Sequence, residues 1–253
     1  MRNHIGLFSG IGGFELAAKG AGFDTVQMVE IDPFCQAVLE KNFPGVAIHG
    51  DIAKFDGQPF YGRIDLITGG FPCQDVARVN RNANGLQGRR SGLWRELLRC
   101  IGEIRPRFAV IENVDSLRRS GLGTVLGDLS AIGYDAEWHS IPAAIVAAPH
   151  NRQRIWVIAY PRSESTPQTD PVFSPFGVQW DAWSDAGWQD WRRIPAVDWA
   201  IPKPGGNRGH DGFSRWMDAY QSQMRALGNA IVPQVAFPIL QAIQEALHEN
   251  ETH

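Results

Sequence analysis

The sequence predicts an α/β fold in which a mostly parallel sheet carries helices on both faces. Over residues 1–160, short β-rich apolar runs alternate with stretches of helical periodicity, the pattern of strands joined by crossover helices. The chain has 253 residues, of which 43% are hydrophobic and 20% charged, enough for one large domain with a full core. The alternation stops between Pro161 and Met224, where seven of the 16 prolines and six of the nine tryptophans fall. We therefore expect a main domain over 1–160, a small irregular lobe over 161–224, and a segment over 225–253 that completes the main domain.

Seven strands and two helices stand out along the chain. The expected strands cover 4–8, 25–30, 46–49, 64–69, 108–111, 135–139 and 154–159. A helix should begin after Gly92 and end before Pro106, with one apolar face made by Leu93, Leu97, Ile101 and Ile104. Another should cover 231–247, with Ala236, Leu240, Ile243 and Leu247 in line; Pro233 suits its start and Pro238 can bend it.

Charge and cysteine content narrow the class of protein. The net charge is -3, which argues against a protein that coats nucleic acid electrostatically. No apolar run approaches the roughly 20 residues of a membrane span, and the N-terminus lacks a secretory signal, so we expect a cytoplasmic protein without a membrane partner. Cys35, Cys73 and Cys100 are too few and too scattered for a disulfide framework or a C-x-x-C metal site. We expect three free thiols, with Cys100 in the core, and no metal.

The first strand leads into a glycine turn, Phe8 to Gly13, that can present backbone N–H groups to a nucleotide. Glu15 stands where the dinucleotide fingerprint requires its third glycine, so NAD and FAD are disfavoured. Glu30 follows the second strand and suits a ribose. Asp51 follows the third and could accept a hydrogen bond from the adenine amine, although a helix N-cap explains it equally well. Together these features indicate an adenosyl pocket without a pyrophosphate, as S-adenosylmethionine requires.

A second chemical group follows the fourth and fifth strands. Cys73 comes just beyond the fourth strand, where open α/β sheets place their reactive groups, although a lone buried cysteine is more often inert. Glu112 closes the next strand, so the two residues should meet at one edge of the sheet. A cysteine paired with a glutamate does not suit acyl transfer, which needs a base for the thiol proton. The pair suits a substrate that must itself be protonated, such as a pyrimidine ring.

The order of these motifs resembles that of the DNA (cytosine-5)-methyltransferase family, in its prokaryotic or phage form. The matching stretches cover residues 5–160 and 225–247 and leave 161–224 unmatched, where that family carries its target recognition domain. The motifs are Phe8-Ser9-Gly10-Ile11-Gly12-Gly13, Glu30, Gly50-Asp51, Phe71-Pro72-Cys73-Gln74, Arg90-Ser91-Gly92-Leu93-Trp94, Glu112-Asn113-Val114, Asn151-Arg152-Gln153-Arg154-Ile155 and Gly228-Asn229-Ala230-Ile231-Val232-Pro233. The resemblance implies a Rossmann-like S-adenosylmethionine-dependent methyltransferase fold with a short recognition lobe.

The resemblance also implies catalytic roles. Cys73 would add to C6 of a cytosine flipped out of duplex DNA, and Glu112 would hold N3 and the exocyclic amine. Arg152 and Arg154 would contact the base and steady the catalytic loop, with Arg154 as the base contact by register. His150 departs from the glutamine usual at its position, and the loop sequence from Val76 to Arg81 departs as well, which leaves open how the loop closes.

The same resemblance implies cofactor and DNA contacts. The expected cofactor residues are Phe8, Gly10, Ile11, Gly12, Gly13, Glu30, Ile31, Asp51, Ile52, Gly70, Pro72, Leu93, Asn229 and Ala230. The segment 74–92 would be a loop that closes over the flipped base. The arginines expected near DNA are Arg78, Arg81, Arg89, Arg90, Arg192, Arg193, Arg208 and Arg215, with solvated surface arginines as the alternative.

Several alternatives stay open at this point. The same chemistry could act on tRNA, the fold could belong to a catalytically dead binding protein, or the chain could be a nicotinamide oxidoreductase. The expected partner is double-stranded DNA, bound by a monomer in a bacterial cell, host or phage encoded. A cognate restriction endonuclease is a further expected partner of such an enzyme.

Overall fold

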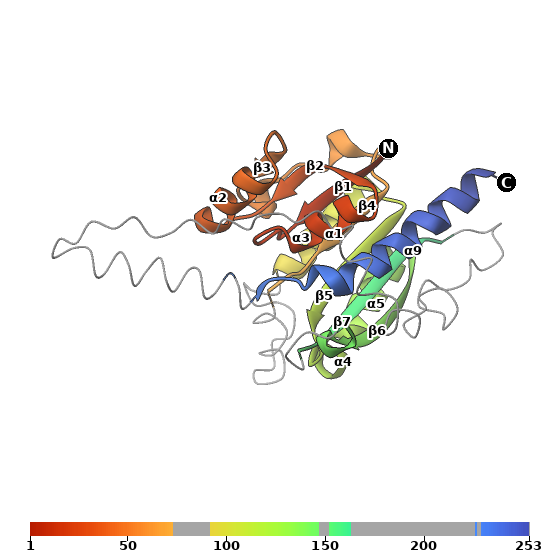
Figure 1. Cartoon of the computed structure of the whole chain (residues 1–253). Helices are drawn as coiled ribbons and strands as arrows, with labels where there is room; N and C mark the ends of the chain where they lie inside the picture. The colour runs from red at the N-terminus through yellow and green to blue at the C-terminus, as the bar shows by residue number, and fades with distance from the viewer. Residues whose placement is uncertain (73–91, 147–151, 163–225, 227–228, 253) are drawn as a thin grey trace.

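The computed structural model describes residues 1–72, 92–146, 152–162, 226 and 229–252. Its centre is a seven-stranded sheet with the order β3-β2-β1-β4-β5-β7-β6 (Figure 1). The strands are β1 (Arg2–Leu7), β2 (Phe23–Val29), β3 (Ala47–His49), β4 (Leu66–Gly69), β5 (Phe108–Val114), β6 (Tyr134–Pro142) and β7 (Gln153–Pro161). The helices are α1 (Gly13–Gly20), α2 (Pro33–Asn42), α3 (Gly92–Ile104), α4 (Leu117–Ser120), α5 (Leu122–Ala131) and α9 (Pro233–Thr252). Short 3-10 turns cover Ile52–Lys54, Gln58–Phe60 and Ala143–Val146.

The sheet is mostly parallel, as predicted. Strands β1 to β5 pair in parallel, and only β7 runs antiparallel, to both β5 and β6. All seven expected strands are present, but several boundaries differ. The first strand ends at Leu7 rather than at residue 8, because Phe8 has a φ of 56°, which an extended strand does not allow. Strands β6 and β7 are longer than expected because their pairing continues to Pro142 and Gln153.

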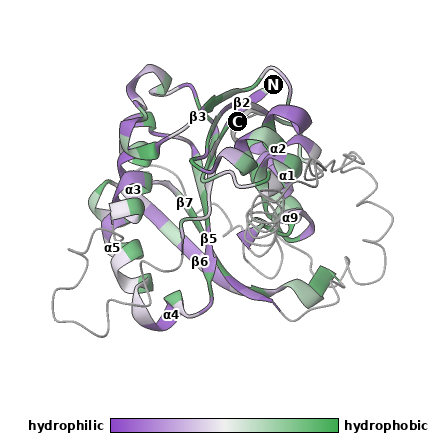
Figure 2. Cartoon of the chain, turned by 90° about the vertical axis from the view of Figure 1, so that its left-hand side faces the viewer, coloured by the Kyte–Doolittle hydropathy of each residue, from purple (hydrophilic) through white to green (hydrophobic). Residues whose placement is uncertain are grey.

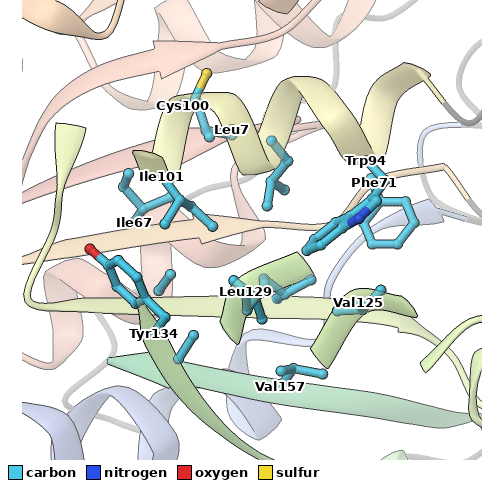
Figure 3. Packing of buried hydrophobic residues seen from close by; sticks show 14 of the residues in the cluster. Leu7, Ile67, Phe71, Trp94, Cys100, Ile101, Val125, Leu129, Tyr134 and Val157 are labelled. Carbon is cyan, nitrogen blue, oxygen red and sulfur yellow. The ribbon is translucent and has the colours of Figure 1, made fainter. Parts of the chain in front are cut away.

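Helices cover both faces of the sheet, and each face has its own apolar core. Helices α1 and α9 pack on one face, and α3 and α5 pack on the other (Figure 2). The core on the α3 side includes Leu7, Ile67, Leu129 and Val157 (Figure 3). This arrangement confirms the predicted α/β fold with two covered faces.

The two helices predicted from periodicity are confirmed. In α3, Leu97, Ile101 and Ile104 are fully buried and Leu93 is half-buried, with Cys100 beside them in the core. The expected stripe of α9, formed by Ala236, Leu240, Ile243 and Leu247, is buried against α1 and the sheet. Pro238 lies inside α9, which continues past it to Thr252.

The parallel strands bring distant parts of the sequence to one edge of the sheet. The carboxyl ends of β1, β2, β4 and β5 lie side by side, so the glycine turn, Glu30, Gly70 and Glu112 share that edge. Within the described part of the chain, no helix is long and apolar enough to cross a bilayer.

Candidate active site

The turn after β1 is closed by its own backbone. The N–H of Ser9 donates to the carbonyl of Val29 (3.1 Å), and the N–H of Gly12 donates to the carbonyl of Ser9 (2.9 Å). Gly10 and Gly12 have φ values of 56° and 93°, which favour glycine. A Cβ at Gly12 would also lie 2.5 Å from the ring of Phe43, whereas a Cβ at Gly10 would meet no described residue within 4 Å. The turn is therefore tight on its inner side and open at Gly10.

Glu30 is fixed to this turn. Its Oε2 accepts a hydrogen bond from the N–H of Gly10 (2.7 Å), and its Oε1 accepts one from the N–H of Asp32 (2.8 Å). Burial raises the pKa of Glu30, and the two backbone hydrogen bonds oppose that rise. Sequence alone placed Glu30 near the turn, and the structure adds that its carboxylate holds the turn in shape.

The neighbouring residues form a partly apolar rim. Ile31 is 70% exposed, which is unusual for a large aliphatic side chain beside a buried carboxylate, whereas Ile52 is buried. Asp51 accepts a hydrogen bond from the N–H of Ala53 (3.0 Å) and lies 3.9 Å from the Lys54 ammonium. The structure thus shows the N-cap role for Asp51 that the residues left open, and its contact with an adenine stays a prediction.

The end of β4 is tied to β5. The side-chain amide of Asn113 donates to the carbonyl of Phe71 (2.9 Å), and Pro72 is exposed at the edge. Gly70 faces Glu112 closely, since a Cβ there would lie 3.3 Å from Glu112 Oε2. Cys73 directly follows this anchored end and lies outside the described residues. So do the expected DNA contacts, Arg78, Arg81, Arg89, Arg90, Arg192, Arg193, Arg208 and Arg215.

Glu112 and Arg154 form an ion pair within the predicted catalytic set. Arg154 Nε lies 2.9 Å from Glu112 Oε1. The register explains this contact: Arg154 is opposite Val114 on β7, one diagonal step from Glu112 on the same face. Burial raises the pKa of Glu112 to about 7, against the opposing charges of Arg154 and Arg152. Burial and the two guanidinium charges therefore act on this carboxyl in opposite directions.

A small cavity, partly open to solvent, lies at this ion pair. It is lined by Glu112, Ile141, Ala143, Arg152, Arg154, Trp156, Val232 and Val235. The sequence identified the charged members of this set but missed Trp156 and the aliphatic members. The register of β7 against β5, which no motif encodes, would have been needed to find Trp156.

Ile231 connects the two ends of the site. A Cβ at Gly13 would lie 2.8 Å from the Ile231 carbonyl oxygen, and one at Gly70 would lie 3.4 Å from Ile231 Cδ1. Of its neighbours, Ala230 packs with Ile11 and Cys35, and Asn229 is exposed. Two glycines therefore allow the segment before α9 to pass between the glycine turn and the cavity, which supports the expected position of Asn229 and Ala230 near the turn.

Glu15 has an unexpected environment. It is fully buried on α1, and within the described part of the chain neither carboxylate oxygen meets a partner in hydrogen-bonding geometry. Burial raises its pKa to about 7. Only a glycine at position 6 leaves room for it, since a Cβ there would lie 1.9 Å from Glu15 Oε1. The residue that argued against a dinucleotide fingerprint is therefore a buried acid beneath the turn.

The remaining cysteines and acidic groups give no metal centre in the described part of the chain. Cys35 and Cys100 are free, buried thiols, as expected. Among the residues with described positions, no three His, Cys, Asp or Glu side chains are close enough to share a metal ion.

Comparisons with known proteins show that this chain is similar to DNA methyltransferases. Residues 3–178 match the family model for the C-5 cytosine-specific DNA methylase. The Type II methyltransferase M2.BsuMI of Bacillus subtilis is 36% identical over 163 residues, which cover 61% of this chain and 41% of that protein. The Type II methyltransferase M.CviJI of a Paramecium bursaria Chlorella virus is 31% identical over 154 residues, which cover 60% of this chain and 41% of that protein.

A solved structure of a methyltransferase has a similar fold. A protein described as a DNA modification methyltransferase encoded within an Escherichia coli prophage superposes with a TM-score of 0.56 at 30% identity, over 69% of this chain and 51% of that one. The chain spans about two fifths of the length of the two curated relatives above. Because the family model covers well over half of the sequence, and because the glycine turn, Glu112 and Arg154 lie at one sheet edge, the chain belongs to the C-5 cytosine-specific DNA methylase family.

Proposed function

We propose that this protein transfers a methyl group from S-adenosylmethionine to C5 of a cytosine in double-stranded DNA. The observation that carries the proposal is the Glu112–Arg154 pair. It is a carboxyl with a pKa of about 7, next to a guanidinium and at the sheet edge where β4 ends four residues before Cys73. A carboxyl that holds a proton at neutral pH can donate it to a pyrimidine nitrogen.

The residues at the other end of the edge fit an adenosyl group. The turn is open at Gly10, Glu30 lies beside it, and the exposed Ile31 offers an apolar surface for a purine. Phe8, Gly12, Asp51 and Ile52 would complete this pocket, with Leu93, Pro72 and Asn229 toward the methionine. When bound, S-adenosylmethionine supplies an electrophilic methyl group on a positively charged sulfur.

The protein groups would activate the base as follows. The Cys73 thiolate forms a bond to C6, and the electron pair of the C5–C6 double bond moves toward C5 and N3. Glu112 gives its proton to N3 and so neutralises that charge, while Arg154 contacts the base and keeps the carboxyl in place. Once C5 carries the methyl group, the C5 proton is lost to a base, the Cys73 thiolate departs and the N3 proton returns to Glu112, which restores the neutral aromatic ring and the protein groups. Flipping the cytosine out of the duplex costs a few kcal/mol, which arginine contacts to phosphate would offset.

Partners are inferred from the relatives. Both curated relatives above are Type II methyltransferases, which favours duplex DNA as the substrate and a restriction endonuclease as the biological partner. We infer that the chain acts as a monomer and that residues 161–224 read the target sequence. Transfer RNA is the competing substrate: an excess of unmodified tRNA should leave methylation of duplex DNA unchanged.

The test of this function is covalent capture. Incubated with S-adenosylmethionine and duplex DNA carrying 5-fluorocytosine, the protein should form an adduct that survives denaturing electrophoresis, because fluorine blocks release of the thiolate. Cys73→Ser should form none while it still binds cofactor. Cys100→Ala, which changes a thiol in the core, is the matched control and should still form the adduct. Adduct formation by Cys73→Ser would rule out the assigned nucleophile.

A further inference from the structure

Trp156 lines the cavity at the Glu112–Arg154 ion pair, where the proposed function places the cytosine. In the antiparallel pairing of β5 with β7, Trp156 is the residue directly opposite Glu112. Directly opposite side chains project from the same face of a sheet, with Cβ atoms about 5 Å apart. Both residues line the same cavity. Trp156 is therefore the cross-strand neighbour of the predicted proton donor.

Glu112 has different neighbours on its two sides in the sheet. Glu112 has Gly70 on its β4 side, which contributes no side chain, and Trp156 on its β7 side. Trp156 is 2% exposed, and its ring packs edge-on against Phe14 of α1, with ring centroids 5.8 Å apart. The ring is thus held in place by a residue of α1, the helix that directly follows the glycine turn. The residue opposite Glu112 on β7 is therefore a buried aromatic ring rather than a polar or solvated side chain.

Within the described part of the chain, the indole nitrogen of Trp156 makes no hydrogen bond that would fix the ring beside Glu112. The indole Nε1–H is buried and has no hydrogen-bond partner among the residues that the structure describes. A buried donor without a partner is unfavourable compared with a purely apolar ring. The role of this position is therefore carried by the area and shape of the ring, and a phenylalanine should preserve most of it.

We propose that Trp156 is a positioning residue whose ring shields the Glu112 carboxyl from water on the β7 side of the pocket and so favours its uncharged form. Desolvation disfavours the charged form of a carboxylic acid, and an aromatic wall is an effective source of it. Among the residues with described positions, the charged groups that act on Glu112 are Arg154 and Arg152, and both act in the opposite direction. The other residues that line the cavity come from β6, the 3-10 turn after it, the segment before α9 and α9 itself, and all of them are apolar. The proton-donor role of Glu112 comes from the proposed function, but its ionisation can be measured without DNA.

The test measures the ionisation of Glu112 directly. The chain is labelled with glutamate carrying carbon-13 at the carboxyl, and the Glu112 resonance is identified by its absence in Glu112→Gln. Trp156→Thr removes the aromatic ring beside Glu112 but keeps a β-branched residue that suits a strand. Trp156→Val makes the same change with an apolar residue, in case the threonine variant does not fold. Trp156→Phe keeps an apolar ring. Trp138→Thr, on β6 and 39% exposed, is the matched control.

The expected result is a pKa of Glu112 near 7 in the wild type, in Trp156→Phe and in Trp138→Thr. In Trp156→Thr or Trp156→Val it should be lower by at least about one pH unit. Single-turnover methylation by these two variants should then fall about tenfold at pH 8 and much less at pH 6. An unchanged pKa in these two variants would overturn the proposal. If the wild type shows no methylation or adduct, the proposed function fails, while the titration still decides the role of Trp156.

Discussion

Glu30 and Glu112 are equally buried carboxylates at the same sheet edge, with 9% and 8% exposure, yet they are held in opposite ways. Glu30 accepts hydrogen bonds from two backbone N–H groups, at Gly10 and Asp32. Glu112 is paired with the guanidinium of Arg154, a half-buried side chain on a different strand. Burial alone therefore does not distinguish the two sites.

The difference lies in what each partner can do. Backbone amides in a closed turn cannot move away, so Glu30 is a fixed part of the cofactor side. An arginine side chain is less rigidly fixed than a closed backbone turn, and burial raises the pKa of Glu112 to about 7, so we assign proton transfer to this residue. We infer that the Glu30 end of the sheet edge binds the cofactor and that the Glu112 end carries out the chemistry on the base.

The largest effect should follow from a change at the chemical end. Glu112→Gln removes the proton donor and keeps the size of the side chain, so kcat should fall by about 10²–10⁴-fold with DNA affinity nearly unchanged. Single-turnover methylation and DNA binding would be measured side by side. Glu40→Gln, an exposed change on α2, should behave as wild type. Unchanged turnover in Glu112→Gln would remove Glu112 from its assigned role.

A change at the binding end should act on affinity instead. Glu30→Gln replaces an ionic acceptor of two backbone N–H groups with a weaker neutral one, so S-adenosylmethionine should bind about 10- to 100-fold more weakly. Calorimetric titration of the cofactor measures this, and kcat at saturating cofactor should recover. A large loss of kcat at saturation would contradict the division between binding and chemistry.

The close contact between the glycine turn and Ile231 can be tested by adding one methyl group at Gly13. Gly13→Ala would place a Cβ 2.8 Å from the Ile231 carbonyl oxygen and 2.9 Å from its Cβ. We expect a loss of about 2 kcal/mol in the free energy of unfolding, measured with urea. Gly102→Ala in α3, where a Cβ meets nothing within 4 Å, should instead be neutral or stabilising by about 0.5–1 kcal/mol. Equal effects of the two changes would argue against a tight contact at Gly13.

The smallest effect concerns the buried acid beneath the turn. Burial raises the pKa of Glu15 from 4.5 to about 7, so the folded chain binds this proton more tightly than the unfolded chain. Its stabilising contribution is complete below about pH 4.5 and is lost as the pH rises through about 7. Glu15→Gln cannot ionise, so its unfolding free energy relative to wild type should be higher at pH 8 than at pH 5, by on the order of 1 kcal/mol. Thermal unfolding at both values measures the difference, and a pH-independent difference would show that Glu15 stays ionised.

Much of this architecture could be predicted from the sequence, because it depends on periodicity. The seven strands, the apolar stripe of α3 and the stripe of α9 follow from side chains repeating every two or every 3.6 residues. The meeting of Glu30 with Gly10, and of Glu112 with the end of β4, follows from the rule that parallel strands share one edge.

Other features could not be predicted because they depend on pairing across distance. Trp156 is opposite Glu112 only in the register that β7 adopts against β5. The burial of Glu15 depends on the missing side chain at Gly6, nine residues earlier. The end of β1 at Leu7 reflects the backbone of Phe8, which its apolar side chain does not reveal.

The central claim is tested most directly by methyl transfer from labelled S-adenosylmethionine to unmethylated genomic DNA, with the modified positions mapped at base resolution. We predict label on C5 of cytosine within one short sequence context, lost in Cys73→Ser and nearly lost in Glu112→Gln. Absence of label on DNA, from a chain that still binds the cofactor, would contradict the claim.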